Sequence, residues 1–559
     1  MWLIDTSTLQ LKSVTEADKG SYAVLSHTWG DDEVTFEQFR TSQIAPENAR
    51  QNVRFSKIIK TCELAAQHGL SYAWIDTCCI EKSSSAELSE AINSMFRYYE
   101  NAAFCIAFIS DLPGSSDCTT LNQQFASRFP RCRWLTRGWT LQEMIAPSRV
   151  LFYDSTWAFR GSKNDWKSLL SKETGVNEAI LDNSMELRLI PVAQRMCWAS
   201  KRRTTRVEDT AYCLMGIFDV NMPLIYGEGK KAFTRLQEEI AKQSYDLSLF
   251  AWQQVGTAQN YRGILASSPE EFFKCSGLKH RIRSAIFPTE FTLTNRGLRT
   301  EGAALANVPT ATHDLIWNLG FSYRDDWPIN TSQGWIGIYL AKTQNGFVRA
   351  RPSELFEAGF ERRIRCPPRL IHVRKIVDLA ESCEVDKRFE RAIKVELRQS
   401  LVSPQSVTLK TPIPETLWVE NEATFLHQGR GINAYIRGEV QTSTLTFQDV
   451  IFACSTMDTP VCAIIDSRDH TWSEIDTFLT ISNERADFVA ADYLRALVPY
   501  DELSSKAMKK IKIPGTESFM VISAELNEYT LDKVEMRFTW RINALLQQDV
   551  IEQDDEMVM

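Results

Sequence analysis

The sequence predicts an α/β fold, in which a parallel sheet with a helical extension is followed by a β-rich C-terminal domain. Before residue 155, short continuous apolar runs alternate with helical segments, and after about residue 246 strand-like runs replace the helical periodicity. Continuous apolar strands that are joined by helices are typical of parallel sheets covered on both faces. We therefore expect a domain over 1–245, with its sheet at about 20–155 and its helical extension at 160–245, and a second domain over 246–559.

The first two strands are predicted at two apolar runs, residues 22–26 and 71–76. The segment between them, 53–68, carries its apolar side chains on one helical face, and Gly69 is well placed to end that helix. The order strand, helix, strand is the start of a parallel sheet.

The next helix is predicted to begin at a capping box, Ser84-x-x-Glu87, and its apolar face extends to Tyr99. A third apolar run covers 104–109, and we expect a long loop over 112–133. A short helix that ends before Pro147 and a fourth strand over 149–154 complete the predicted series.

Glu143, on the first turns of that short helix, is the candidate functional carboxylate. It follows a stretch rich in arginine and tryptophan: Arg131, Arg133, Trp134, Arg137 and Trp139. Burial among aromatic rings raises a carboxyl pKa, whereas arginines and a helix N-terminus favour the ionised form. The alternative is a salt-bridged helix start with no function.

Polar residues follow each predicted strand, and parallel sheets bind ligands outside the carboxyl ends of their strands. The residues concerned are Ser26 to Asp32, Asp76 to Cys79, Ser110-Asp111 and Asp154. The loop that leads to Glu143 leaves the same edge, so we expect Glu143 at the mouth of a crevice there.

The helical extension contains one glycine-rich stretch, Gly227-Glu-Gly229-Lys-Lys231, before an amphipathic helix predicted over 232–243. It lacks the spacing of a phosphate-binding loop, and no clear strand precedes it, so an ordinary helix entry is the favoured interpretation. In the second half, residues 535–542 alternate strictly between apolar and polar, which predicts a half-buried strand.

Composition excludes several classes of function. The 559 residues are 44% hydrophobic and carry a net charge of −8, which argues against a non-specific nucleic-acid binder or a polybasic membrane surface. Thirteen scattered cysteines fit reduced thiols. Without a signal peptide or an apolar run long enough to span a membrane, we expect a cytoplasmic protein with no transmembrane segment and no nucleic-acid partner.

Metal and cofactor chemistry find little support. The seven histidines are spread along the chain, with no HExxH and no Cys/His cluster at zinc spacing. The G-x-S-x-G elbow and the Rossmann glycine fingerprint are both missing. We therefore expect no bound metal and no cofactor.

Several blocks resemble the fungal heterokaryon incompatibility (HET) domain. They are Tyr22-Ala-Val-Leu-Ser-His-Thr-Trp-Gly30, Tyr72-Ala-Trp-Ile-Asp-Thr-Cys-Cys-Ile80, Arg137-Gly-Trp-Thr-Leu-Gln-Glu143, Arg206-Val-Glu-Asp209 with its continuation to Ile217, and Pro223-Leu-Ile-Tyr-Gly-Glu-Gly229. The resemblance covers about residues 1–245. It implies a role in non-self recognition between fungal individuals, which is followed by programmed cell death. It also implies that the partners are a second copy of the chain or other incompatibility proteins.

A more distant resemblance connects the same region to Toll/interleukin-receptor (TIR) domains, whose sheet is flavodoxin-like. Residues 24–31 are similar to the first TIR strand and loop, and Trp139-Thr-Leu-Gln-Glu143 has the spacing of the Trp-Cys-x-x-Glu segment of plant TIR domains, with Thr140 in place of Cys. The Glu of that segment is catalytic in those TIR domains that cleave NAD. The resemblance therefore implies that Glu143 is catalytic and that NAD is the substrate, not a cofactor.

A lone carboxylate suits this reaction. The nicotinamide ring is a pyridinium in NAD and departs as a neutral molecule, so no acid is needed to protonate it. One carboxylate can then stabilise the ribosyl cation. We expect the substrate-binding residues to be Ser26, His27, Trp29, Gly30, Asp76, Arg137 and Trp139. The alternatives are that both tryptophans are core residues, that Asp76 is a strand-end turn former and that Ser26 is a loop cap. A non-enzymatic interaction module, with Glu143 in a structural ion pair, is the rival function.

Overall fold

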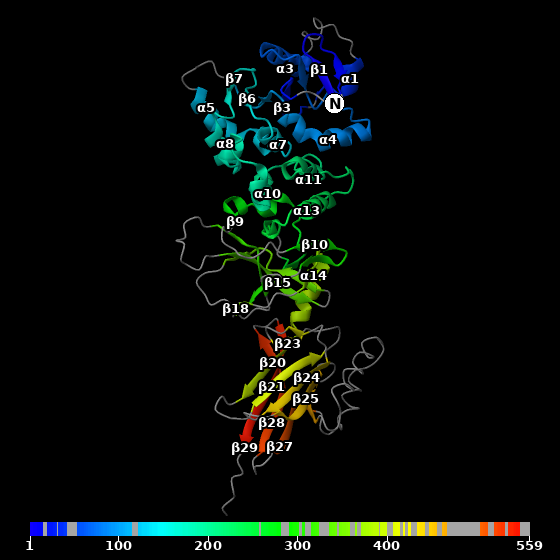
Figure 1. Cartoon of the computed structure of the whole chain (residues 1–559), viewed down its shortest axis with the longest axis vertical. Coiled ribbons are helices and arrows are strands. Elements are labelled where there is room, and N and C mark those ends of the chain that lie inside the picture. The colour runs from blue at the N-terminus through cyan, green and yellow to red at the C-terminus, as the bar shows by residue number, and fades with distance from the viewer. Residues whose placement is uncertain are drawn as a thin grey trace, which may run out of the picture.

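We describe the fold from a computed structural model of the full chain. The described residues are 1–14, 19–30, 32–41, 53–114, 121–256, 259–280, 290–300, 305–307, 315–323, 335–343, 346–357, 364–365, 370–390, 392–399, 406–413, 418–419, 423–425, 433–441, 446–455, 461–466, 504–512, 519–531 and 535–547. Figure 1 shows an elongated molecule, with the N-terminal sheet and helices at one end and the last strands at the other.

The N-terminal part contains a seven-stranded sheet in the order β2-β1-β4-β3-β5-β6-β7. Its strands are β1 Trp2–Asp5, β2 Leu11–Ser13, β3 Tyr22–His27, β4 Tyr72–Trp74, β5 Phe104–Phe108, β6 Val150–Tyr153 and β7 Phe159–Ser162. The four predicted strands, β3 to β6, are mutually parallel, which confirms that part of the prediction.

The sheet as a whole is mixed, which corrects the expectation of a purely parallel one. β1 pairs antiparallel with β2 and β4, and β7 pairs antiparallel with β6. β1–β2 and β6–β7 are hairpins, which can only pair antiparallel. Their short outer strands, β2 and β7, are mostly not buried, so they lack the continuous apolar run by which we predicted the inner strands.

The helices of this part are α1 Phe36–Thr41, α3 Ser56–Gln67, α4 Ser85–Glu100, α5 Leu121–Arg128, α6 Arg133–Thr136 and α7 Thr140–Ile145. The predicted capping box is confirmed at its N-cap, because the Ser84 hydroxyl accepts a hydrogen bond from the backbone N–H of Glu87. The loop expected over 112–133 is wrong from residue 121 onward. Helix α5 forms there, and Phe125 stacks on Phe129 at 4.5 Å and on Trp166 at 4.3 Å.

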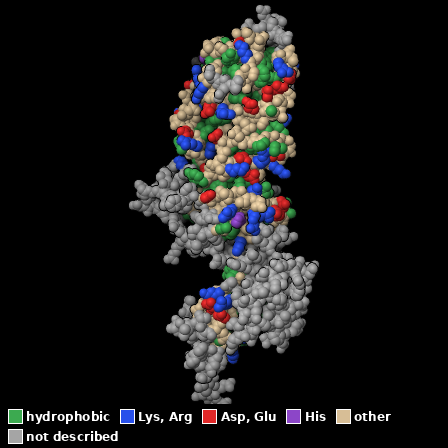
Figure 2. All heavy atoms as spheres, turned by 45° about the vertical axis from the view of Figure 1, so that its right-hand side comes forward, with side chains coloured by type: hydrophobic (Ala, Val, Ile, Leu, Met, Phe, Trp, Pro, Cys, Tyr) green, Lys and Arg blue, Asp and Glu red, His purple; other side chains and the backbone are tan. Residues whose placement is uncertain are grey.

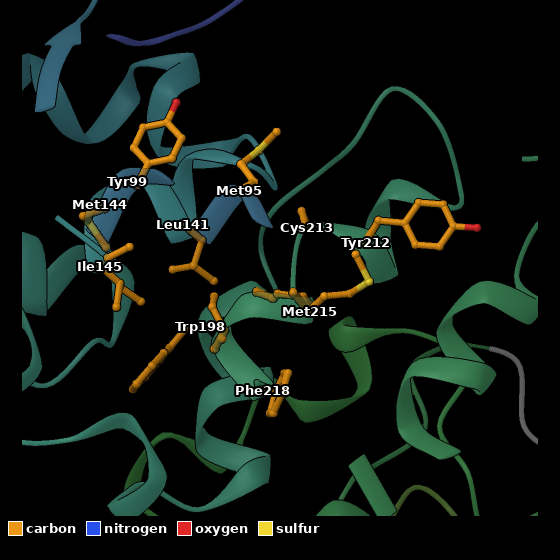
Figure 3. Close-up of a cluster of buried hydrophobic side chains, with 14 of the residues drawn as sticks. Met95, Tyr99, Leu141, Met144, Ile145, Trp198, Tyr212, Cys213, Met215 and Phe218 are labelled. Carbon is orange, nitrogen blue, oxygen red and sulfur yellow. The ribbon is translucent and has the colours of Figure 1, made fainter. Parts of the chain in front are cut away.

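The helical extension packs directly against these elements. It comprises α8 Lys167–Thr174, α9 Glu178–Leu181, α10 Val192–Ala199, α11 Asp209–Tyr212, α12 Met215–Phe218 and α13 Lys231–Gln243. Figure 3 shows the buried side chain of Leu141 in α7 pointing toward Trp198 of α10 and Met215 of α12, and α4 also contacts α12. The helix that carries Glu143 is therefore held between the sheet domain and the extension.

The glycine-rich stretch at 227–231 is an ordinary helix entry, as favoured. The backbone N–H groups of Gly227 and Gly229 donate to the Glu208 carboxylate at 2.8 and 3.0 Å. These donors are already engaged by a carboxylate of the chain itself, so they are not open to a phosphate.

The second half is β-rich, as predicted, with the added helix α14 Leu379–Glu390. Its first strands are β8 Tyr261–Arg262, β9 Lys279–His280, β10 Phe291–Thr294, β11 Gly297–Thr300, β12 Leu305–Asn307, β13 Leu315–Asn318, β14 Phe321–Ser322, β15 Ile336–Thr343, β16 Gly346–Ala350, β17 Phe356–Glu357, β18 Ile364–Arg365 and β19 Ile371–Val373. All but β9 and β14 belong to one ten-stranded sheet.

The last strands form two more sheets of six and four strands. They are β20 Ile393–Gln399, β21 Ser406–Ile413, β22 Trp418–Val419, β23 Thr424–Phe425, β24 Asn433–Gln441, β25 Thr446–Ser455, β26 Val461–Asp466, β27 Lys506–Lys512, β28 Phe519–Leu531 and β29 Glu535–Gln547. The strand expected at 535–542 lies within β29, where Trp540 and Ile542 are buried.

Two clusters of buried apolar side chains hold the chain together. The larger one runs from Leu3 to Val373, and the smaller one from Ala341 to Ile542. Strands β15 and β16 contribute to both. The larger cluster therefore continues past residue 245, and the domain boundary expected there stays a prediction.

The surface carries no large field of one sign on the face in Figure 2, where basic and acidic side chains are interspersed over the N-terminal half. No helix among the described residues has the length and apolar content that crossing a membrane requires.

Candidate active site

A cavity of about 620 Å³ opens outside the carboxyl ends of β3 and β4, at the sheet edge where we expected the site. It is lined by Thr28, Trp29, Asp76, Ile80, Lys82, Leu88, Ile92, Met95, Arg133, Thr136, Arg137, Trp139, Glu143, Arg203, Thr204, Thr205, Arg206, Asp209 and Tyr226. Five of the predicted site residues thus share one cavity: Trp29, Asp76, Arg137, Trp139 and Glu143.

Glu143 lies in the first turn of α7 and is only 5% exposed. The Ser26 hydroxyl donates a hydrogen bond to Glu143 Oε2 at 2.5 Å, and the Trp134 indole N–H donates to Ser26 Oγ at 2.7 Å. Ser26 is fully buried at the end of β3, so it contacts Glu143 from beneath the cavity and does not line it. The structure thus shows Ser26 as a hydrogen-bond donor to Glu143, and a contact of Ser26 with the substrate stays a prediction.

The environment of Glu143 raises its pKa to about 8. Burial is the main cause, and the negative charge of Asp76 adds to it, while the Ser26 hydrogen bond, Arg137 and Arg202 act in the opposite direction. Of the two opposing influences on this pKa that the sequence predicted, burial has the larger effect. The carboxyl is therefore mostly protonated at neutral pH in the empty cavity.

The start of α7 is fixed by Arg202, which the sequence did not single out. Arg202 Nη1 donates to the Arg137 carbonyl and to Thr140 Oγ1, both at 2.9 Å. Thr140 in turn donates to the carbonyls of Trp134 and Arg137. Thr140 is thus a buried link between the arginine and the helix start.

Trp29 and Asp76 form one wall of the cavity. Trp29 is 40% exposed, so the core alternative for this residue is wrong. Its indole N–H donates to Asp76 Oδ2 at 2.8 Å, and Lys82 Nζ lies 3.8 Å from the centre of its ring. The ring is held at the cavity rim with one face near a cation.

His27 and Gly30 are not part of the lining. His27 is buried, with Nε2 3.5 Å from Glu33 and Nδ1 3.9 Å from Asp76, so it contacts a different set of groups from Ser26. Adjacent strand residues point to opposite faces of the sheet. The backbone N–H of Gly30 donates to Glu33 at 2.9 Å.

Other polar residues expected at this edge lie elsewhere. Asp154 is buried in an ion pair with Arg160, and Arg131 is exposed outside the lining. Cys78 and Cys79 are buried and also do not line the cavity, and Asp31 lies outside the described residues.

The opposite wall comes from the helical extension, which the prediction left out of the site. Tyr226 donates to Asp209 Oδ1 at 3.1 Å, the Trp139 indole also hydrogen-bonds to Asp209, and Arg206 lies 4.4 Å from the Tyr226 ring. Arg206, Asp209 and Tyr226 stand in the two later sequence blocks quoted for the HET resemblance. Those blocks were the available indication that the extension takes part in the site.

The comparisons with known proteins agree with the sequence blocks. Residues 22–124 match the family described as heterokaryon incompatibility protein (HET), so this part of the chain is a HET domain. Residues 231–292 match a domain of unknown function, DUF8212.

One curated relative is homologous to part of the chain. The vegetative incompatibility protein HET-E-1 of Podospora anserina is 44% identical over 222 residues, which are 40% of this chain and 16% of that relative. The chain therefore matches only a small part of its relative. No solved structure matches the chain.

Proposed function

We propose that this protein acts in vegetative incompatibility, as an effector of cell death after non-self recognition, and that its HET domain hydrolyses NAD to nicotinamide and ADP-ribose. The HET match over residues 22–124 and the homology to a vegetative incompatibility protein support the biological role. One observation carries the activity: a buried carboxyl, Glu143, lines a cavity that also holds tryptophans and cationic side chains.

The strand order supports a TIR-like, flavodoxin-like interpretation of the sheet. The parallel strands lie side by side in the order β4-β3-β5-β6. Numbered by their order in the sequence, these four strands have the spatial order 2-1-3-4. Flavodoxin-like sheets have this order and bind ligands where the order reverses, beside the first strand. Ser26, at the end of that first strand, contacts Glu143.

The proposed reaction requires Glu143 to be ionised. When the bond between nicotinamide and ribose breaks, its electron pair leaves with nicotinamide and neutralises the pyridinium, and a ribosyl cation develops. An ionised Glu143 stabilises that cation or orients water, whose oxygen bonds to the ribose C1′ while a proton is released. The positive nicotinamide ring favours ionisation of Glu143 when it enters, because an opposite charge lowers a carboxyl pKa.

The test is release of free nicotinamide from NAD by the full-length protein. We expect release by the wild type, a loss of at least about 100-fold in Glu143→Gln, which removes the charge but keeps the shape, and no change in Glu37→Gln. Glu37 is a suitable control because it lies on α1 in an exposed pair with Arg40. Equal release of nicotinamide by the wild type and by Glu143→Gln would contradict the proposal.

We also propose that the active form is assembled, either from copies of this chain or with other incompatibility proteins. The activity is therefore assayed over a range of protein concentrations, alongside the oligomeric state. Cell killing that survives Glu143→Gln in a folded protein is the result expected of a non-enzymatic interaction module.

A further inference from the structure

The wall of the cavity that the helical extension forms carries two arginines, one of which, Arg206, is attracted by the nearby charges of Glu208 and Asp209 without forming an ion pair with either. The residues between α10 and α11 that line it, Arg203 to Arg206, are called here the 203–206 segment. Arg203 and Arg206 are exposed, and neither forms an ion pair with any residue that the structure describes. Unpaired cations in a concave site concentrate anions there.

The 203–206 segment is held in a defined place beside the helix of Glu143. The Arg203 N–H donates to the Thr136 carbonyl at 2.7 Å, and the Gly138 N–H donates to the Arg203 carbonyl at 2.8 Å. Thr204 closes the segment on itself, since its hydroxyl donates to the Arg206 carbonyl at 2.6 Å. The two guanidinium groups therefore belong to an ordered wall.

The charges of the whole lining point to a polyanionic ligand. The lining holds five cationic side chains, Lys82, Arg133, Arg137, Arg203 and Arg206, and three acidic ones, Asp76, Glu143 and Asp209. The cations therefore exceed the carboxylates even if all three carboxyl groups are ionised. Aromatic rings lie on both walls, Trp29 on one and Tyr226 on the other.

We propose that Arg203 and Arg206 form the diphosphate subsite of this cavity, so that its substrate is a dinucleotide in which a diphosphate joins two ribosides. Arginine suits this role because its planar guanidinium binds phosphate oxygens with two parallel hydrogen bonds. The diphosphate lies several bonds away from the nicotinamide–ribose bond, so a site for it must be separate from Glu143 but within the same cavity. The identity of the substrate rests on the proposed function.

The test measures binding of ADP-ribose, inorganic pyrophosphate and adenosine to the full chain by calorimetry. We expect ADP-ribose and pyrophosphate to bind and adenosine to bind at least tenfold more weakly than ADP-ribose. In the double variant Arg203→Gln/Arg206→Gln, both anions should bind about 100-fold more weakly, since each charge-assisted contact accounts for about tenfold. Raised salt should weaken the binding in the wild type.

Two variants control for folding and for general charge. Lys201→Gln removes an exposed cation next to the 203–206 segment but outside the lining, and should bind as the wild type does. Arg203→Lys/Arg206→Lys keeps the charges and should recover part of the affinity. Adenosine binding as tightly as ADP-ribose, or undiminished binding by the Gln double variant, would overturn the subsite.

The subsite and the proposed activity can fail separately. If ADP-ribose binding depends on both arginines but no nicotinamide is ever released, the activity is wrong and the subsite stands. If the wild type releases nicotinamide and the Gln double variant keeps the same KM for NAD, the activity stands and the subsite is wrong.

Discussion

At the scale of single residues, the protonation of Glu143 controls what the cavity can do. Its pKa of about 8 leaves only about one tenth of the carboxyl ionised at pH 7. The pH dependence of kcat/KM reports on groups of the free enzyme. We therefore expect kcat/KM for NAD to rise about tenfold per pH unit below pH 8 and to level off above it. A profile that is flat between pH 6 and 9 would contradict a catalytic carboxylate at Glu143.

The same pKa predicts how Glu143 affects stability. In the unfolded chain the carboxyl has an ordinary pKa near 4.5, and folding raises it to about 8. The folded state then binds the proton more tightly, so the free energy of unfolding falls as the pH rises from about 4.5 to 8 and changes no further above. Glu143→Gln has no such charge to bury.

We expect Glu143→Gln to gain stability relative to the wild type between pH 5 and pH 9, by up to a few kcal/mol. Denaturant unfolding of both proteins at the two pH values measures the difference. If the two proteins differ by the same free energy of unfolding at pH 5 and at pH 9, Glu143 has an ordinary pKa in the folded protein, whatever its role in a reaction.

Ser26 is the adjacent residue whose effect can be predicted. Its hydrogen bond lowers the pKa of Glu143, against the effect of burial. Ser26→Ala removes the donor, so the pH profile should move to higher pH and kcat/KM at pH 7 should fall about tenfold. Ser7→Ala, in which an exposed hydroxyl beside Asp5 is lost, serves as the control. An unmoved profile would mean that Ser26 does not control the charge of Glu143.

At the scale of elements, the contact between α7 and the 203–206 segment depends on a glycine. A Cβ at Gly138 would lie 2.5 Å from Thr204 Cγ2 and 3.1 Å from Cys213 Sγ. Gly138→Ala should therefore push the segment away and destabilise the protein by about 1–3 kcal/mol, with weaker nucleotide binding. Thermal unfolding and ADP-ribose calorimetry measure both effects.

The steric clash between the added methyl group at position 138 and Thr204 can also be relieved by a change at Thr204. Thr204→Ser removes the methyl group and keeps the hydroxyl, so adding it to Gly138→Ala should restore part of the stability and binding. Gly277→Ala is the matched control, because its Cβ would meet nothing closer than 3.8 Å. If Gly138→Ala behaves like Gly277→Ala, the segment is not held as described.

These elements also show what the sequence could and could not predict. The strands β3 to β6 were predictable because each is a continuous apolar run, and the edge position of Glu143 followed from their order. The pairing of Arg203 with Thr136 and Gly138 was not, because it joins segments more than sixty residues apart and leaves no periodic pattern. Helix α5 was missed for a related reason: its one aromatic side chain, Phe125, packs on Phe152 and Trp166, which are also distant in sequence.

At the scale of the whole molecule, the site depends on residues beyond the predicted domain boundary. The first backbone N–H groups of α10, those of Val192 and Ala193, donate to the side chains of Asp246 and Ser248 at 2.8 and 3.0 Å. Helix α10 leads directly into Arg202 and the 203–206 segment. Buried Arg349 of β16 in turn binds the carbonyls of Phe250 and Trp252.

We therefore expect truncation to damage the site in a graded way. A chain that ends at residue 245 loses both caps of α10, at about 1 kcal/mol each, as well as buried Phe250 and Trp252. Its midpoint of thermal unfolding should lie more than about 10 °C below that of the full chain, since several kcal/mol are lost in total. A chain that ends at residue 280 keeps the caps and loses Arg349, so its midpoint should lie between the two.

Nucleotide binding should follow the same order, because the caps of α10 hold the wall that carries Arg203 and Arg206. Ser248→Ala in the full chain isolates one cap, and it should lower the midpoint slightly and weaken ADP-ribose binding more than Ser155→Ala does. Ser155 is a fair comparison, since it is exposed and lies outside both the caps of α10 and the cavity lining. If the chain ending at 245 unfolds at the same temperature as the full chain and binds equally well, the site lies wholly within residues 1–245, and the domain boundary predicted from the sequence is also the boundary of the working unit.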